Sequence, residues 1–509
     1  VFWYPLCYNV HSFYISLYNA HLMRSCLSDF FFIFGKSVET RCLSCYTLFG
    51  RKGIAVPVSY ARLWKLLVDK RMSKTDLKDA SGISTNVLAK LGKDELVSMD
   101  SMEKICRTLS CDIGDVMEVL IPTDTVGSNE PKEQICVYDE RYKKISEVDW
   151  SFINSRQDSI SLLHPYPARF IDALPRQLIS IIGCPDDTAI FDPFCGSGTT
   201  LIEAQRAGIQ SVGVDLNPIA CLISRVKTTP LDDSFLEVAR RVHDAAYELF
   251  TTDYVTIPGI PNLDHWFKES IQKALSALMQ VISSEKSETN KDALSFALSS
   301  IIVRVSNQES DTRYAAIEKR ITGEDVFSSF QSACKKLAFA KQETSFLVPA
   351  KVIENNILTL DASRIGQPVG LVITSPPYPN AYEYWLYHKY RMWWLGYDPI
   401  SVRSFEIGAR PHYQKKNGQT EKDFAAQMEG VFKLFDSCVI QGGHVCIVIG
   451  RSIIRGREID NAALITEIAI NHNYSLVAKI PRDIASTRKS FNLSYGKITT
   501  EYILVLRRD

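Results

Sequence analysis

An apolar run that ends in two prolines constrains the fold of this chain more than any other stretch. Residues Val369–Ile373 read as a buried parallel strand, and the pentapeptide Thr-Ser-Pro-Pro-Tyr (374–378) follows at once. Consecutive prolines end a strand in a stiff turn, and α/β proteins bind ligands at the carboxyl ends of parallel strands. A hydroxyl (Ser375), rigid carbonyls (Ser375, Pro376) and an aromatic ring (Tyr378) suit a planar base that carries an amino group. An ordinary strand-ending turn explains the pentapeptide alone equally well.

A glycine-rich turn earlier in the chain predicts a second ligand-binding strand end. Ala189–Phe191 is a short apolar strand, Asp192 ends it, and the turn Gly196–Gly198 leads into a helix that begins at Thr199. Glycines let the backbone approach a ligand closely, and a helix N-terminus favours a carboxylate. The next strand ends at Asp215, which is placed to accept hydrogen bonds from two ribose hydroxyls. This order predicts a nucleoside cofactor, and the absence of the pattern G-x-G-x-x-G argues against NAD.

A helical insertion at residues 231–345 separates these strands from a third, which we predict at 355–362. Asp361 at its end is placed to accept from an adenine amine, although the same residue can instead cap a helical turn. The insertion should project from the edge of the sheet. An ordinary helical cap is one interpretation of it; the other, target recognition with Arg304 and Arg313 as candidate residues, is what the family resemblance given below implies.

Residues 56–120 form a separate all-α unit. Ser73 and Ser84 can cap two short helices that a glycine turn joins, which is the helix-turn-helix pattern. The unit resembles the Cro/C1-type family, which implies DNA binding through the outward residues of the second helix, Thr85, Asn86 and Lys90. A helical bundle kept for dimerisation is the alternative. Residues 121–135 are rich in Pro, Gly, Ser and charge, and we interpret them as a linker.

Four motifs decide between these alternatives for the rest of the chain: HPYPARF (164–170), DPFCGSGTT (192–200), GVDLNP (213–218) and TSPPY (374–378). Together they resemble the S-adenosylmethionine-dependent DNA amino-methyltransferases, over residues 160–509. The resemblance implies an α/β, Rossmann-like methyltransferase domain at 136–509 that uses S-adenosyl-L-methionine. The cofactor-binding residues it implies are Tyr166, Asp192, Phe194, Gly196, Gly198, Thr199, Thr200, Asp215 and Asp361. The catalytic residues it implies are Ser375, Pro376, Pro377 and Tyr378.

The chemistry of an exocyclic amine explains the pentapeptide. The lone pair of such an amine is delocalised into the ring, so acceptors at Ser375 and the Pro376 carbonyl would draw the nitrogen toward tetrahedral geometry. The base must be flipped out of the duplex, with Tyr378 stacking on it. Ser at position 375 resembles the cytosine-N4 enzymes, whereas Asp is usual in the adenine-N6 enzymes, which stay an alternative. Cytosine-C5 methylation is disfavoured because Cys195 lies in the cofactor loop and no Pro-Cys-Gln motif is present.

The expected partner is double-stranded DNA, with a separate restriction endonuclease and a homodimer through the helix-turn-helix unit as further expectations. A DNA-binding regulator that kept a methyltransferase fold, and methylation of RNA bases, are the competing functions. A net charge of +0 means that DNA binding must rely on local basic surfaces. The predicted DNA contacts are Thr85, Asn86, Lys90, Arg304, Arg313, Lys415, Lys416 and Arg488.

The remaining composition predicts a cytoplasmic, nucleoid-associated protein. Thirteen Cys lack the paired spacing of a zinc site, so no metal is expected, and no apolar run is long enough for a membrane span. Residues 1–55 are nearly devoid of charge and show no period. We interpret them as translated leader ahead of a start near Val56, because Arg51–Gly53 can be encoded by a purine-rich ribosome-binding sequence. A native peptide from residues 1–50, detected by mass spectrometry, would refute this.

Overall fold

A computed structural model describes residues 58–119, 140–483 and 500–509, apart from 71, 93, 153–154, 156–157, 312, 343–347, 381 and 416. The predicted leader, the predicted linker, Lys416 and Arg488 lie outside the described residues. The chain divides into two compact units, residues 1–135 and 136–509.

The N-terminal unit is a small helical bundle closed by a two-stranded sheet. The side chain of Ser73 accepts from Asp76 N and that of Ser84 from Val87 N, so both predicted caps are confirmed. Gly82 makes the turn between the capped helices with φ +68°. Leu77 and Leu91 are buried in a common core. The elements are β1 (Val58–Ser59), α2 (Ala61–Asp69), α3 (Lys74–Ser81), α4 (Thr85–Leu91), α5 (Met99–Leu109), α6 (Ile113–Val116) and β2 (Glu118–Val119).

The larger unit is built on a seven-stranded sheet of order β10-β11-β7-β6-β3-β4-β5. The strands from β7 to β5 are parallel, and β11 runs antiparallel to both β7 and β10. The Rossmann-like sheet and its final antiparallel pair are therefore confirmed. The strands are β3 (Ala189–Asp192), β4 (Ser211–Asp215), β5 (Ala350–Glu354), β6 (Val369–Thr374), β7 (Val439–Gly450), β10 (Tyr474–Asp483) and β11 (Thr500–Arg508).

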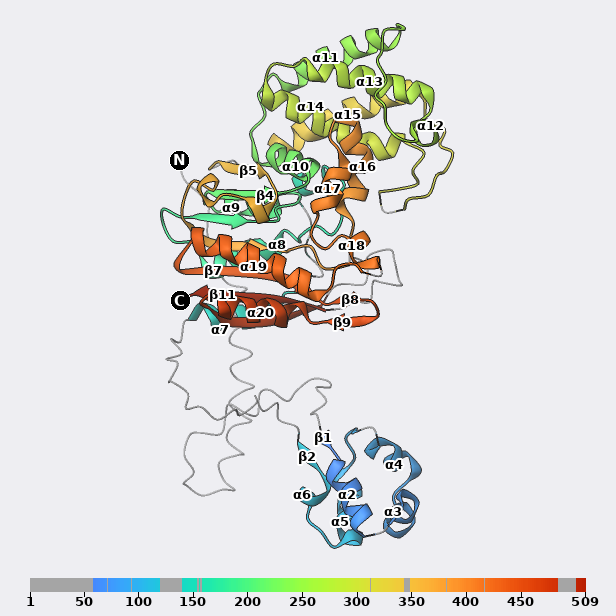
Figure 1. The fold of residues 1–509 in the computed structure, drawn as a ribbon, viewed down its shortest axis with the longest axis vertical. Coiled ribbons are helices and arrows are strands. Elements are labelled where there is room, and N and C mark those ends of the chain that lie inside the picture. The colour runs from blue at the N-terminus through green and yellow to red at the C-terminus, as the bar shows by residue number, and fades with distance from the viewer. Residues whose placement is uncertain are drawn as a thin grey trace, which may run out of the picture. The chain divides into compact units, whose positions relative to one another are not determined.

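Helices cover both faces of this sheet, because alternate strand residues point to opposite sides (Figure 1). In β6, Val372 packs in the cluster under α19 and α20, whereas Leu371 and Ile373 pack in the cluster with α7, α8 and α9. These helices are α7 (Glu140–Glu147), α8 (Ala173–Ile182), α9 (Thr199–Arg206), α19 (Glu421–Cys438) and α20 (Asn461–Asn471).

The insertion between β4 and β5 is helical, as predicted, and gathers beyond the β4–β5 edge of the sheet (Figure 1). Its core also contains Ile219 and Leu222 of α10 and Tyr390 and Trp394 of α16, so insertion and sheet domain share one apolar cluster. The helices are α10 (Pro218–Thr228), α11 (Phe235–Phe250), α12 (Leu263–Trp266), α13 (Glu269–Ser283), α14 (Glu288–Val305), α15 (Gly323–Gln342) and α16 (Tyr384–Trp394).

The prediction of a strand at 355–362 is wrong. The third strand is β5, which ends at Glu354 and pairs with β4 along its whole length. The residues that follow form two short 3-10 turns, because the side chains of Asn356 and Asp361 each accept a backbone N–H two residues on. The remaining elements are η1 (Ile160–Leu162), η2 (Ile357–Thr359), η3 (Ala362–Arg364), α17 (Pro399–Phe405), α18 (Arg410–Gln414), β8 (Ser452–Ile454) and β9 (Arg457–Ile459).

Within the described residues, no helix combines the length and the apolar character needed to cross a bilayer. The same part of the chain holds no cluster of His, Cys, Asp and Glu side chains arranged for a metal ion.

Candidate functional site

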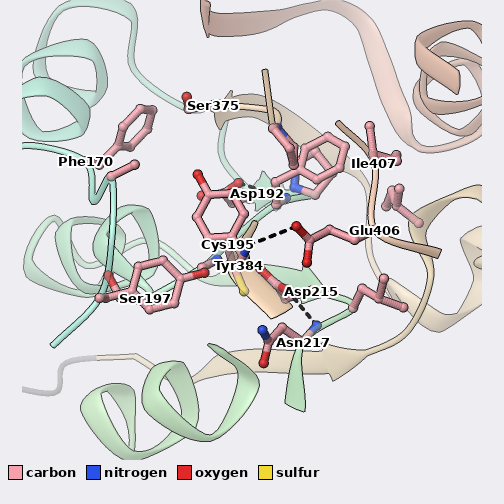
Figure 2. Close-up of a pocket in the computed structure, with 18 of the residues that line it drawn as sticks. Phe170, Asp192, Cys195, Ser197, Asp215, Asn217, Ser375, Tyr384, Glu406 and Ile407 are labelled. Carbon is pink, nitrogen blue, oxygen red and sulfur yellow. Dashed lines mark hydrogen bonds between the residues drawn. The ribbon is translucent and has the colours of Figure 1, made fainter. Parts of the chain in front are cut away.

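One cavity lies at the carboxyl ends of β3, β4 and β6, where residues of all four predicted motifs meet (Figure 2). Ser375 from the pentapeptide lines the same cavity as the glycine-rich turn and Asp215. Predicted residues that line it are Tyr166, Asp192, Phe194, Gly196, Thr199, Thr200, Asp215, Ser375 and Pro377. Predicted residues that do not are Gly198, Asp361, Pro376 and Tyr378.

The glycine-rich turn after β3 leaves no room for a side chain at either of its two glycines. Gly196 has φ +49°, and a Cβ there would lie 3.1 Å from the hydroxyl of Tyr166. Gly198 has φ +79°, and a Cβ there would lie 2.9 Å from Ser224 Oγ. The turn is also tied to the next strand, because Gly196 N donates to Asp215 Oδ2 at 2.9 Å. A ligand in the cavity therefore meets backbone directly.

Two buried carboxyl groups lie at the ends of β3 and β4. Asp192 accepts from Thr374 Oγ1 at 2.7 Å, which joins the strand of the pentapeptide to the strand of the glycine-rich turn. Asp215 accepts from Asn217 N at 2.8 Å (Figure 2). Burial raises the pKa of both Asp192 and Asp215 to about 6. The hydrogen bonds that each carboxylate accepts lower its pKa, but by less than burial raises it. A cationic ligand would lower both pKa values and so favour the ionised forms.

A third carboxyl group, Glu406, lines the cavity and was missed by the sequence analysis. It follows α17 and accepts from Tyr384 N at 2.9 Å and Trp385 N at 2.7 Å, which stabilises the start of α16. Burial raises its pKa to about 8. No local motif marks this residue, because it reaches the cavity from a loop 208 residues beyond Gly198, the last residue of the glycine-rich turn (406 − 198). Phe170, Asn355, Asn356 and Ile357 are further lining residues that were not predicted.

Asp361 does not reach the cavity. Its side chain is exposed and accepts from Ser363 N at 2.9 Å, so the capping alternative describes it. Hydrogen bonding to Ser363 lowers its pKa. The wall beyond β5 is made instead by Asn355, Asn356 and Ile357, and Asn355 N donates to Asp215 O at 3.0 Å.

The predicted DNA contacts lie on several separate elements. Thr85 and Asn86 are exposed on α4, and Lys90 on the same helix is half-buried. Arg304 is exposed at the end of α14, and Arg313 pairs with Glu309 at 2.8 Å. Lys415 is exposed after α18.

Comparison with known families assigns both parts of the chain. Residues 62–120 match the Cro/C1-type HTH DNA-binding domain, residues 93–225 match a DNA methylase, and residues 164–383 match an RMKL-like methyltransferase domain. The chain carries a DNA methylase domain and a Cro/C1-type helix-turn-helix domain. Methyltransferases of this class take S-adenosyl-L-methionine as the methyl donor, so this is the cofactor that the cavity has to fit.

The curated relatives are type II methyltransferases. M.MvaI of Kocuria varians is 28% identical over 159 residues (28% of this chain and 35% of the relative). M.MjaII of Methanocaldococcus jannaschii is 35% identical over 92 residues (17% of each chain). M.BsoBI of Geobacillus stearothermophilus is 24% identical over 285 residues (50% of this chain and 56% of the relative). The matches thus span between about a sixth and just over half of the relatives' lengths.

One similar solved structure is that of the transcriptional regulator VanUg, which is 45% identical to this chain in the matched region. The match covers 14% of this chain and 97% of that chain, with a TM-score of 0.13. The rRNA methyltransferase AviRa from Streptomyces viridochromogenes has 12% identity, with 71% of this chain and 96% of that chain covered, and a TM-score of 0.29.

Proposed function

We propose that this protein is a site-specific DNA methyltransferase that transfers a methyl group from S-adenosyl-L-methionine to the exocyclic N4 of cytosine. The observation that carries the proposal is the shared cavity. Of the three hydroxyl-bearing residues in the pentapeptide, only Ser375 lines this cavity, together with the glycine-rich turn and Asp215. The Thr374–Asp192 hydrogen bond fixes the two strand ends to each other.

The lining residues suit this cofactor. S-adenosyl-L-methionine supplies an electrophilic methyl group on a cationic sulfonium. The turn at Gly196 offers backbone without side chains, and Asp215 has the position of a ribose acceptor. Asp192, Asp215 and Glu406 are buried carboxyl groups with raised pKa values, and a cation among them would relieve the cost of ionising them.

The target amine would meet Ser375 and the Pro376 carbonyl as hydrogen-bond acceptors. Accepting its N–H bonds localises the nitrogen lone pair and orients it for in-line attack, so positioning and polarisation supply the rate enhancement. Pro376 is not among the lining residues, so this role requires its carbonyl to meet the base when the base binds. The base enters by flipping out of the duplex.

Serine at position 375 is the basis for choosing cytosine over adenine-N6. The experiment that tests the choice is incubation of the protein with plasmid DNA and labelled cofactor, followed by digestion to nucleosides. N4-methylcytosine is the expected product. N6-methyladenine would refute the argument from Ser375, and the absence of any methylated base would refute methylation as a whole.

The Cro/C1-type domain supports a second role, regulation of transcription through α4, with Thr85, Asn86 and Lys90 as contacts. A variant that lacks residues 56–120 separates two uses of the domain. Retained methylation with lost promoter binding would assign it to regulation, whereas loss of both would assign it to binding of substrate DNA. We further propose a separate restriction endonuclease as functional partner and a homodimer through this domain. The candidate contacts on the larger unit are Arg304, Arg313, Lys415, Lys416 and Arg488.

A further inference from the structure

We propose that Glu501 and Arg482, on the last two strands of the sheet, are positioning residues that fix the ring of Tyr378. The role of that ring at the target base rests on the function proposed above. Neither residue belongs to a recognised motif of this chain, and both lie more than 100 residues beyond the pentapeptide.

A chain of hydrogen bonds runs from the pentapeptide to the far edge of the sheet. The hydroxyl of Tyr378 donates to Glu501 Oε1 at 2.8 Å. The other oxygen of the same carboxylate, Oε2, accepts from Arg482 Nη1 at 2.7 Å. Arg482 Nε donates in turn to the carbonyl of Trp150 at 3.0 Å. Arg482 is only 7% exposed, so its guanidinium is held from two sides in a poorly solvated position.

The backbone of the same turn is held from the opposite direction. Asn380 N donates to Gly408 O at 2.9 Å. Gly408 has φ +76°, and a Cβ there would lie 2.8 Å from the carbonyl of Tyr378, so glycine is needed for this close approach. The main chain of Tyr378 is thus fixed by one contact and its hydroxyl by another. Fixing both ends of a tyrosine side chain sets the direction in which the ring points, and packing against the neighbouring apolar cluster restricts its rotation about that axis.

These contacts explain why the ring is fixed before any base arrives. The ring packs against the apolar cluster under α19 and α20 and stays half-buried. Burial and the Glu501 carboxylate both raise the pKa of Tyr378, so the hydroxyl keeps its proton and remains a donor. A ring that is already in its stacking orientation does not lose rotamer freedom when a flipped base binds. The tether should therefore favour the catalytic step more than the binding of cofactor.

A double-mutant cycle tests the tether. Tyr378→Phe keeps the ring and removes the donor, and Glu501→Gln keeps the shape and removes the charge. With plasmid DNA and labelled cofactor, each single variant should lower kcat by about tenfold, on the order of one charge-assisted hydrogen bond. The dissociation constant for S-adenosyl-L-methionine should not change. The double variant should be no slower than the slower single variant, because Tyr378→Phe removes the donor and Glu501→Gln removes the acceptor charge of one and the same hydrogen bond.

Two controls match these substitutions. Tyr474→Phe removes a buried tyrosine hydroxyl on β10 that has no hydrogen-bond partner among the described residues. Glu458→Gln removes one partner of an exposed ion pair with Arg451. Both control variants should keep the wild-type kcat. Losses that multiply in the double variant, or a Tyr378→Phe enzyme with wild-type kcat, would overturn the proposal.

The same cycle measured on urea unfolding needs no substrate. Coupling between the two substitutions there supports the tether, and additive effects count against it. Should wild-type protein produce no methylated base, the proposed function fails, and the tether is then judged on the unfolding cycle alone.

Discussion

The two strand-end turns that form the cavity are held in different ways. The glycine-rich turn after β3 is fixed by neighbours from the next strand and helix, such as Asp215 and Ser224. The Ser-Pro-Pro-Tyr turn after β6 is fixed from much farther along the chain, by Glu501, which lies 123 residues beyond Tyr378. The first turn therefore depends on local sequence, and the second depends on the completed sheet. Substitutions in the glycine-rich turn should therefore change mainly the affinity for the cofactor, whereas substitutions in the Ser-Pro-Pro-Tyr turn should change mainly kcat.

The largest effect should come from Ser375→Ala. Loss of an acceptor that acts on the target amine should lower kcat by about 100-fold, the order seen when one transition-state hydrogen bond is removed. The affinity for S-adenosyl-L-methionine, measured by calorimetry, should stay within twofold. If affinity falls as much as kcat, the division between the two turns is wrong.

Acid should weaken cofactor binding next most strongly. The pKa values of Asp192 and Asp215 in the empty cavity are about 6. Above that pH both carboxylates are ionised, whereas below it a cationic ligand must displace their protons. Affinity should therefore begin to fall as pH drops below about 8, where Glu406 takes up its proton, and fall more steeply below about 6, by up to about tenfold per pH unit for each carboxyl group. S-adenosylhomocysteine, which lacks the sulfonium charge, should show a weaker dependence. If the affinities of both ligands fell equally with pH, the sulfonium charge could not be the cause of the pH dependence.

Gly196→Ala should weaken cofactor binding by about tenfold, because it combines a left-handed φ with a clash against Tyr166. Gly208→Ala is the matched control, since Gly208 has φ +73° with no atom within 4 Å of the added carbon. The control should lose stability without losing affinity. At saturating cofactor, Gly196→Ala should keep kcat near the wild-type value. A large drop in kcat would show that the glycine-rich turn also acts on the chemical step, contrary to the division proposed between the two turns.

Asp361→Ala should have the smallest effect. The residue caps an exposed 3-10 turn, so the change should cost at most about 1 kcal/mol of stability and leave the cofactor dissociation constant within twofold. Asn356→Ala, at the cavity wall, should weaken binding more. If Asp361→Ala weakened cofactor binding and Asn356→Ala did not, the sequence-based prediction that Asp361 binds the adenine amine would be supported after all.

The contrast between the turns also explains what the sequence could predict. That Asp192, Asp215 and Ser375 line one cavity could be predicted because each lies at the end of a short apolar strand, which is a local pattern. Asp361 was misplaced because Asn356 and Asp361 favour capped turns over a strand, and their side-chain hydrogen bonds compete with pairing. Glu406, Glu501 and Arg482 carry no local signal. Their positions follow from how α17 and the β10–β11 pair pack, which no short window of sequence encodes.

The shared core of the insertion has a consequence for recombination between related enzymes. Tyr390 and Trp394 of α16 are packed with helices α13 and α14, and α16 begins beside the cavity at Tyr384. Residues 231–345 are thus contiguous in sequence without being an independent module. In a chimera joined at those boundaries, the insertion would come from one enzyme and α16 from the other, so the side chains of their shared core would no longer match. Exchange of this region between enzymes must carry the inner face of α16 with it, so changes in the insertion are coupled to the wall of the cavity.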